Sequence, residues 1–422
     1  MKKSFYGKRL ACALLCSICM TSSIGATNTG EPRGGIDVGK YHVDMVSTGS
    51  GPYTVIFESG FASPLGVWQK VAPEIAKSAR TVIYSRAGIG QSDARPEPRL
   101  PQRYSVELDQ LIEAAQLKPP FILVGHSYGG YLIRLFAARH PDQVAGMVFV
   151  DPSMERFDAE LNKVDAAKLA QDHRRIDALT PPQFKAESKL LDHALATAGK
   201  MPPPKLPDVP AIILTSTMVR PNPEFFMHTQ PAVAVWRNLH DQLFRQFSSG
   251  SHIVTANSGH NIHLEEPALV IGAIQQVMAS ATVLAERRAH QIKVDSLMRT
   301  FDQAATMLKN QRSAEVEQLV AAALTASGLS ERDINSLGYA VLNERRQLAM
   351  STLIMKYNSD TFPESANAHD SYGELLLEMR QPAAAKEQFL QAVALGGKGN
   401  NAKALEAFRS NLAKAEKAIL AQ

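Results

Sequence analysis

Short apolar runs alternate with amphipathic stretches along residues 41–277. The runs are rich in β-branched residues, and several contain no polar residue, as strands buried on both faces of a sheet require. The intervening stretches repeat apolar residues at helical spacing. We therefore predict an α/β domain with a mostly parallel central sheet flanked by helices. The predicted strands are Thr54–Glu58, Thr81–Tyr84, Phe121–Val124, Val144–Val150, Ala211–Thr215 and Ile253–Ala256, and the predicted helices are Trp68–Lys77, Val106–Gln116, Tyr128–Arg139 and Pro267–Met278.

Residues 153–208 interrupt this alternation. They contain two charged helical stretches, Phe157–Leu179 and Pro182–Ala198, and end in the proline-rich segment Met201–Pro204. An insertion of this size between two core strands commonly forms a cap when the neighbouring strand ends carry a site. We predict a helical cap, and a solvated surface decoration is the alternative.

The last third of the chain has a different pattern. Residues 273–327 contain neither glycine nor proline, and no strand pattern follows them, so the tail is predicted to be entirely helical. Within it Leu337-Gly338 and Tyr372-Gly373 recur at a spacing of 35 residues, which suggests stacked helical hairpins. We predict an α/β domain over residues 27–284 and an all-helical, repeat-like domain over residues 285–422.

The first 26 residues have the pattern of a signal peptide. A basic start is followed by a mainly apolar stretch from Leu10 to Met20, and small residues then lead to Ala26. An apolar stretch this short does not span a bilayer, which needs about 20 residues. We predict export to the periplasm or the medium, with no transmembrane segment in the mature chain; an ordinary buried helix and a lipid anchor are the alternatives.

All three cysteines, Cys12, Cys16 and Cys19, lie inside this segment. The mature chain would therefore contain neither a disulfide nor a reactive thiol, although export leads to an oxidising compartment. Its stability would come from packing.

Composition agrees with a folded soluble protein. Hydrophobic residues make up 45% and charged residues 20% of the chain, close to globular averages, which excludes a disordered or collagen-like chain. The net charge of +4 arises in the first 26 positions, which hold four basic residues and no acidic one. Charges balance in the remainder, so composition favours no nucleic-acid partner.

The strongest local motif is Gly125-His126-Ser127-Tyr128-Gly129, between an apolar strand and a helical stretch. In a G-x-S-x-G motif of this kind, a tight turn holds the serine in a strained conformation with its Oγ above the sheet. The glycines leave room for the turn, and the N-terminus of the following helix faces the developing oxyanion. We interpret Ser127 as a nucleophile, and a chance match in a loop is the alternative.

A serine nucleophile needs a base, which a histidine after a late strand can supply. His260 follows the predicted strand Ile253–Ala256 after a short turn. His252 and His263 are its rivals, and we assign both to packing or hydrogen bonding. His126 precedes the nucleophile, and we expect it to point away from the substrate side.

The acidic partner of the histidine has two candidates. The segment after Ala211–Thr215, where the acid is commonly found, contains no aspartate before Glu224, which comes late. Asp151 instead follows the strand after the nucleophile's helix, 24 residues beyond Ser127. A carboxylate there can orient the imidazole and stabilise the imidazolium. We predict Asp151; Glu224 as the acid, or a simple strand-ending turn at Asp151-Pro152, is the alternative.

Two backbone N–H groups are expected to bind the oxyanion. One is that of Tyr128, directly after the nucleophile, and the other comes from the loop after the first core strand. That loop reads Ser59-Gly60-Phe61-Ala62, and we choose the N–H of Phe61. The Phe61 ring either lines an acyl pocket or packs in the core.

Five motifs along the chain occur in a characteristic order. They are Glu58-Ser59-Gly60-Phe61, Ser85-Arg86-Ala87-Gly88-Ile89-Gly90-Gln91-Ser92, Gly125-His126-Ser127-Tyr128-Gly129-Gly130, Val148-Phe149-Val150-Asp151-Pro152 and Ser258-Gly259-His260. Over residues 40–280 the chain thereby resembles the α/β-hydrolase fold superfamily, and within it the esterase and lipase branch. The resemblance implies a Ser, His, acid triad that uses no metal and no organic cofactor.

The chain departs from this resemblance at two points. Ser85 stands where relatives often have aspartate, and the usual late acid is missing. A serine nucleophile also argues against the dehalogenase and epoxide hydrolase branches.

The helical tail carries a second pattern. Gly373, Ala385, Phe389 and Ala392 have a small, small, aromatic, small spacing, whereas the upstream copy has Met350 where a small residue belongs. In this it resembles the tetratricopeptide repeat family. A surface for a protein partner over residues 330–422 and a stabilising buttress are the two interpretations.

Together these motifs predict an exported serine hydrolase that cleaves a carboxylic ester or related acyl bond. Ser127, His260 and Asp151 would act through an acyl-enzyme intermediate on a small-molecule acyl substrate. Thioesterases, amidases or peptidases and acyltransferases use the same triad, so the substrate stays open. The alternative is a non-catalytic or weakly active scaffold that recruits a partner through its tail.

Overall fold

The computed structural model describes residues 35–39, 41–94, 99–309 and 313–421. They form two compact units, of which the first ends at Leu284 and the second begins at Ala285. The predicted signal peptide lies outside the described residues.

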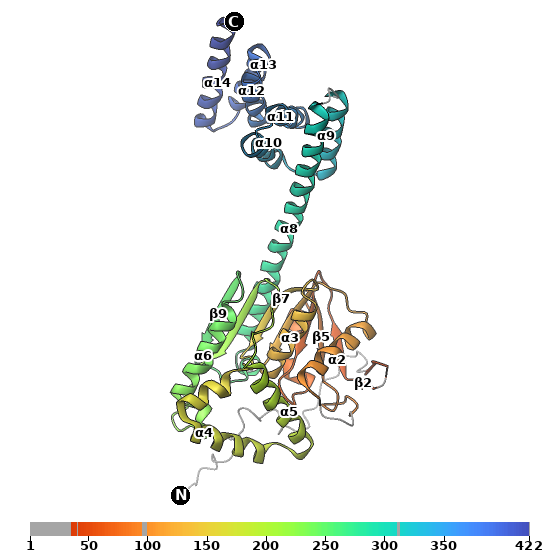
Figure 1. The fold of residues 1–422 in the computed structure, drawn as a ribbon, viewed down its shortest axis with the longest axis vertical. Helices are drawn as coiled ribbons and strands as arrows, with labels where there is room; N and C mark the ends of the chain where they lie inside the picture. The colour runs from red at the N-terminus through yellow and green to blue at the C-terminus, as the bar shows by residue number, and fades with distance from the viewer. Residues whose placement is uncertain (1–34, 40, 95–98, 310–312, 422) are drawn as a thin grey trace. The chain divides into compact units, whose positions relative to one another are not determined.

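A seven-stranded sheet forms the centre of the first unit (Figure 1). Its order is β3-β5-β4-β6-β7-β8-β9, with β3 antiparallel to β5 and every other neighbouring pair parallel. The predicted fold class is therefore confirmed. The strands are β3 (Met45–Thr48), β4 (Thr54–Glu58), β5 (Arg80–Tyr84), β6 (Phe121–His126), β7 (Val144–Val150), β8 (Ala211–Ser216) and β9 (Gly250–Thr255), and β1 (Ile36–Asp37) pairs separately with β2 (His42–Val43).

Each predicted strand is present, and the edge strand β3 was missed. Its sequence, Met-Val-Ser-Thr, is half polar and all four residues are only partly buried. The central strands β4, β6, β7 and β8 are almost completely buried, which is why their sequences are the most apolar.

Helices cover both faces of this sheet. Side chains of α2, α3 and α6 pack on one face, and those of α1 and the start of α8 pack on the other. The helical elements of the first unit are η1 (Leu65–Trp68), α1 (Ala72–Ile75), α2 (Pro101–Ala114), α3 (Tyr128–Arg139), α4 (Phe157–Leu179), α5 (Pro182–Ala198), η2 (Phe226–His228), α6 (Gln230–Phe244), α7 (Ile262–Glu265) and the start of α8 (Pro267–Lys309), which continues past Leu284 into the second unit.

One predicted helix is wrong. The segment Trp68–Lys77 is not a continuous helix: the 3-10 helix η1 ends at Trp68, and only the single turn of α1 is helical after it. Pro73 lies in the middle of this segment, and proline lacks the N–H that a continuous helix needs there. Helices α4 and α5, in contrast, have the bounds predicted for the cap.

Strand register brings the ends of the central strands together at one edge of the sheet. Glu58 of β4 pairs with Gly125 of β6, and His126 of β6 pairs with Val150 of β7. The loop after Glu58 therefore lies beside the turn after His126, and the residue after Val150 lies beside that turn as well. The carboxyl edge of a parallel sheet is where ligands bind in such folds.

By length and composition alone, α8 could cross a membrane, because an 18-residue window in it has a mean hydropathy of 1.7. In the first unit, however, Val270, Ile274 and Val277 of this helix are buried in the core against the sheet. Of that window 33% is buried, so packing accounts for part of its apolar composition.

Every secondary-structure element described in the second unit is a helix. Gly338 and Gly373 occupy close contacts in it, because a Cβ at either position would lie 2.6 Å from the side chain of Met355 or Phe389, respectively. The recurrent small residues therefore let α10 approach α11 and α12 approach α13. The helices are α9 (Ser313–Ser327), α10 (Glu331–Arg345), α11 (Leu348–Thr361), α12 (Ala366–Glu378), α13 (Pro382–Gly396) and α14 (Ala402–Leu420).

Candidate active site

Ser127 lies in the turn between β6 and α3. Its φ of 52° and ψ of −120° belong to a region that residues with a side chain rarely adopt. A Cβ at Gly129 would lie 2.1 Å from the carbonyl oxygen of Glu58, and a Cβ at Gly125 would lie 2.7 Å from that of Gly129. The glycines of the motif therefore allow the turn to pack closely on the end of β4.

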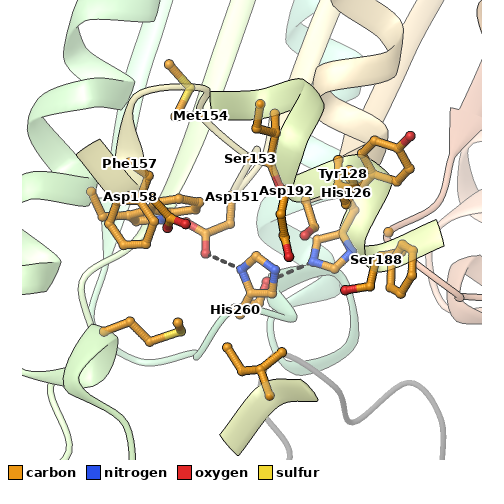
Figure 2. A pocket seen from close by; sticks show the side chains of 18 of the residues that line it. His126, Tyr128, Asp151, Ser153, Met154, Phe157, Asp158, Ser188, Asp192 and His260 are labelled. Atoms are coloured by element: carbon orange, nitrogen blue, oxygen red, sulfur yellow. Dashed lines mark hydrogen bonds and ion pairs between the residues drawn. The ribbon is translucent and has the colours of Figure 1, made fainter. Parts of the chain in front are cut away.

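Asp151 and His260 are hydrogen-bonded to each other. Nδ1 of His260 donates to Oδ2 of Asp151 at 2.7 Å (Figure 2). Asp151 directly follows β7 with a φ of 49°, and His260 lies between β9 and α7. Glu224 lies elsewhere, because its carboxylate pairs with Arg175 at 2.9 Å and both side chains are half exposed. The structure thus brings Asp151, and not Glu224, to His260.

The other carboxylate oxygen of Asp151 also has partners. Oδ1 accepts from the backbone N–H of Ser216 at 2.9 Å and from the indole Nε1 of Trp236 at 2.8 Å. Three donors thus hold a carboxylate that is almost completely buried, as a buried charge requires. Trp236 lies on α6, 85 residues after Asp151, and no local spacing in the sequence could have identified it.

His126 lines the same region, and the expectation that it points away from the substrate side is wrong. Its ring contacts those of His260 and His263, with ring centroids 4.8 Å and 4.3 Å away. Its Nε2 donates to the backbone oxygen of His260 at 3.0 Å. These contacts hold the imidazole at the carboxyl edge of the sheet. His252 bonds to Thr215 at 2.8 Å, and His263 is buried.

The predicted oxyanion donors are the backbone N–H groups of Phe61 and Tyr128. Phe61 lies in the loop after β4, and Tyr128 is the first residue of α3. Within the described part of the chain, neither N–H has a hydrogen-bond acceptor. The two rings pack against each other with centroids 6.2 Å apart.

A cavity of about 270 Å³ joins these residues, and Phe61, Ser127, Tyr128, Asp151 and His260 all lie in its wall. Helices α4 and α5, which we predict to be the cap, contribute both apolar and charged side chains to it. A lining of this mixed kind suits a ligand with apolar and polar parts. The cap residues in the wall include Phe157, Ile176, Leu191 and Leu195 as well as Asp158, Asp177, Lys189 and Asp192.

Carboxylates on α4 raise the pKa of a carboxyl group on α5. Burial, together with the negative charges of Asp158 and Asp177, raises the pKa of Asp192.

Among the residues that the structure describes, no group of three or more His, Cys, Asp or Glu side chains has the arrangement of a metal site.

Two buried histidines should make the stability of the fold depend on pH. Burial lowers the pKa of His240 to about 4 and that of His263 to about 3, because the protein interior disfavours the imidazolium. In the unfolded chain the pKa is about 6.5, so below this pH protons bind the unfolded state preferentially. Folding stability is therefore expected to fall between pH 6.5 and about 4, by about 1.4 kcal/mol per pH unit for each group.

His263→Phe tests this expectation. The Nδ1 of His263 has no hydrogen-bond partner and its ring packs on Trp68, so phenylalanine should fit. Thermal unfolding from neutral to acid pH should show a shallower loss of stability in this variant. His290→Gln, at an exposed position of α8, is the control and should leave the slope unchanged. An unaltered slope in His263→Phe would contradict the assignment.

Part of the chain is similar to known proteins. Residues 53–190 match a family model described as alpha/beta hydrolase fold. The chain is similar to the uncharacterized protein YqjL of Bacillus subtilis, with 29% identity over 55% of this chain and 86% of the relative. It is also similar to a haloalkane dehalogenase of Sphingobium indicum, with 25% identity over 44% of this chain and 69% of the relative.

Among solved structures, a thermophilic esterase from Thermogutta terrifontis is similar to 60% of this chain. The match covers 99% of that esterase, with 17% identity and a TM-score of 0.42.

Proposed function

Since the first unit has the α/β-hydrolase fold, we propose that this protein is a serine hydrolase that cleaves a carboxylic ester or a related acyl bond. The observation that carries the proposal is the 2.7 Å contact between His260 and Asp151 in the wall of the cavity that also contains Ser127. A serine at the nucleophile position argues against halide displacement by a carboxylate. The fold alone does not select a substrate.

In the proposed reaction Oγ of Ser127 attacks the carbonyl carbon of the substrate while Nε2 of His260 takes the serine proton. Asp151 holds the imidazole in the required tautomer and stabilises the imidazolium. The N–H groups of Phe61 and Tyr128 bind the oxyanion. When the tetrahedral intermediate collapses, the leaving alcohol takes the proton from His260. Water then hydrolyses the acyl-enzyme by the same steps.

A fluorophosphonate probe tests the nucleophile directly, because it forms a covalent bond only with an activated serine. We expect labelling at Ser127, identified by peptide mass spectrometry. A series of p-nitrophenyl esters of increasing chain length would then define the acyl group that the cavity accepts. A folded protein that is neither labelled nor active on any ester would support a scaffold role instead.

We also propose that the protein is exported. The basic, apolar and small-residue regions of the first 26 residues support this proposal. Mass spectrometry of the periplasmic or secreted protein should find an N-terminus near Thr27 and no free thiol. A mature chain that retains Cys12 would contradict it.

We propose that the second unit is a tetratricopeptide-like array that serves binding or stability rather than chemistry. All candidate site residues precede position 261, so a chain that ends at Ala285 should keep its activity on small esters. Circular dichroism would establish that this shortened chain is folded. A folded chain that has lost turnover of even the smallest ester would show that the tail shapes the site.

A further inference from the structure

Arg86 belongs to the motif Ser85–Ser92, for which the proposed reaction has no role. It lies two residues after the end of β5, and its side chain is buried. Nη1 donates to Oε1 of Glu58 at 2.5 Å and to the carbonyl oxygen of Ser59 at 2.7 Å. Nη2 donates to the carbonyl oxygen of Gly60 at 2.5 Å. One guanidinium therefore holds the end of β4 and two successive carbonyls of the loop that follows it.

The contact with Gly60 determines where the N–H of Phe61 points. The peptide that joins Gly60 to Phe61 is trans, and in a trans peptide the C=O and N–H bonds point in opposite directions. The carbonyl faces Arg86, and it also accepts from the N–H of Ser63 at 3.3 Å. The N–H of Phe61 therefore points away from Arg86. Gly60 and Phe61 lie in the cavity wall, and Arg86 does not.

Arg86 also contacts the residue that carries the second donor. Its Cζ lies 5.5 Å from the ring centroid of Tyr128 and 5.4 Å from that of Tyr104, within cation–π range. The carboxylate of Glu58 accepts a further hydrogen bond from the Tyr84 hydroxyl. This buried network is separate from the hydrogen bonds of Asp151 and His260, yet it reaches both proposed oxyanion donors.

We propose that Arg86 is the positioning residue of the oxyanion hole. It orients the peptide that carries the N–H of Phe61 and fixes the Tyr128 ring at the start of α3. The inference rests on the proposed hydrolase function. It predicts that loss of the guanidinium weakens binding of the transition state more than binding of the substrate.

A trifluoromethyl ketone measures this difference. Oγ of Ser127 adds to the ketone carbon, the serine proton passes to His260, and the carbonyl oxygen becomes an oxyanion. In Arg86→Lys the positive charge remains, but a single ammonium cannot reproduce the fork that holds Glu58 and two carbonyls. We expect kcat to fall and the ketone's inhibition constant to rise by about 10- to 100-fold, with KM for a small ester changed by less than about threefold.

Arg134 provides a matched control. It is equally buried, donates to Glu155 at 2.8 Å and 3.0 Å and to the carbonyl oxygen of Ser153 at 2.8 Å, and lies 5.2 Å from the Tyr131 ring. Arg134→Lys therefore also disturbs a buried ion pair, but it does not touch the loop at Gly60. The ratio of the ketone's inhibition constant to KM should stay at its wild-type value.

A double variant covers the case in which Arg86→Lys does not fold. Glu58→Gln with Arg86→Met removes both charges together, so no unpaired ion is buried, and the same ratio is measured. A folded variant of either kind with the wild-type ratio would overturn the proposal. Failure of both to fold would also overturn it, because Arg86 would then serve stability.

If the protein is not a serine hydrolase, the inhibition experiment gives a different result. In that case the ketone would not inhibit the wild-type protein, or a Ser127→Ala variant would retain ester turnover. The role of Arg86 would then fall with the proposed function.

Discussion

Replacing Ser127 with alanine is expected to abolish ester hydrolysis while leaving the fold intact. Without Oγ no acyl-enzyme can form, and only the oxyanion donors and substrate binding remain, so kcat should fall by about 10⁴- to 10⁶-fold. The fold should survive because alanine is smaller than serine and the unusual φ and ψ belong to the turn between β6 and α3. Steady-state kinetics on an activated ester and circular dichroism measure the two effects.

The fluorophosphonate probe supplies the control for Ser127→Ala. The variant should lose all labelling, whereas a variant of an exposed serine such as Ser336 on α10 should be labelled like the wild type. Near-normal turnover by a folded Ser127→Ala protein would show that another group is the nucleophile, and the proposed function would be wrong.

Asp151→Asn is expected to have the second largest effect, a fall in kcat of about 10⁴-fold. An asparagine can present its amide group to His260, which favours the imidazole tautomer that cannot accept the serine proton. It also removes the negative charge that stabilises the imidazolium. Since Oδ1 of Asp151 accepts from Ser216 and Trp236, the substituted side chain should keep its place.

Glu224→Gln is the matched control for Asp151→Asn. It also converts a carboxylate to an amide, but it alters only a half-exposed pair with Arg175. Such pairs contribute about 0 to 1 kcal/mol to stability, so activity should stay near the wild-type value. The opposite ranking of the two variants would make Glu224 the acid. Little loss in either would indicate a Ser-His dyad.

The sequence alone determined most of the fold of the first unit. Strands such as Val144–Val150 could be predicted because burial on both faces requires nearly continuous apolar residues. The bounds of Phe157–Leu179 and Pro182–Ala198 followed from helical spacing and proline positions. The turn at Ser127 was also predictable, because the strand, the two glycines and the helix that form it follow one another directly in the sequence.

Tertiary structure decided which groups meet at the site. Sequence separation does not report distance in space, so Asp151 and Glu224 remained rivals until strand register and the loop after β9 brought His260 to the end of β7. For the same reason the sequence did not point to Trp236 or Arg86. Their hydrogen-bond partners, Asp151 and Gly60, lie 85 and 26 residues away in the chain. Local patterns determine which backbone each segment adopts, whereas contacts between distant segments depend on how the whole sheet and its helices pack.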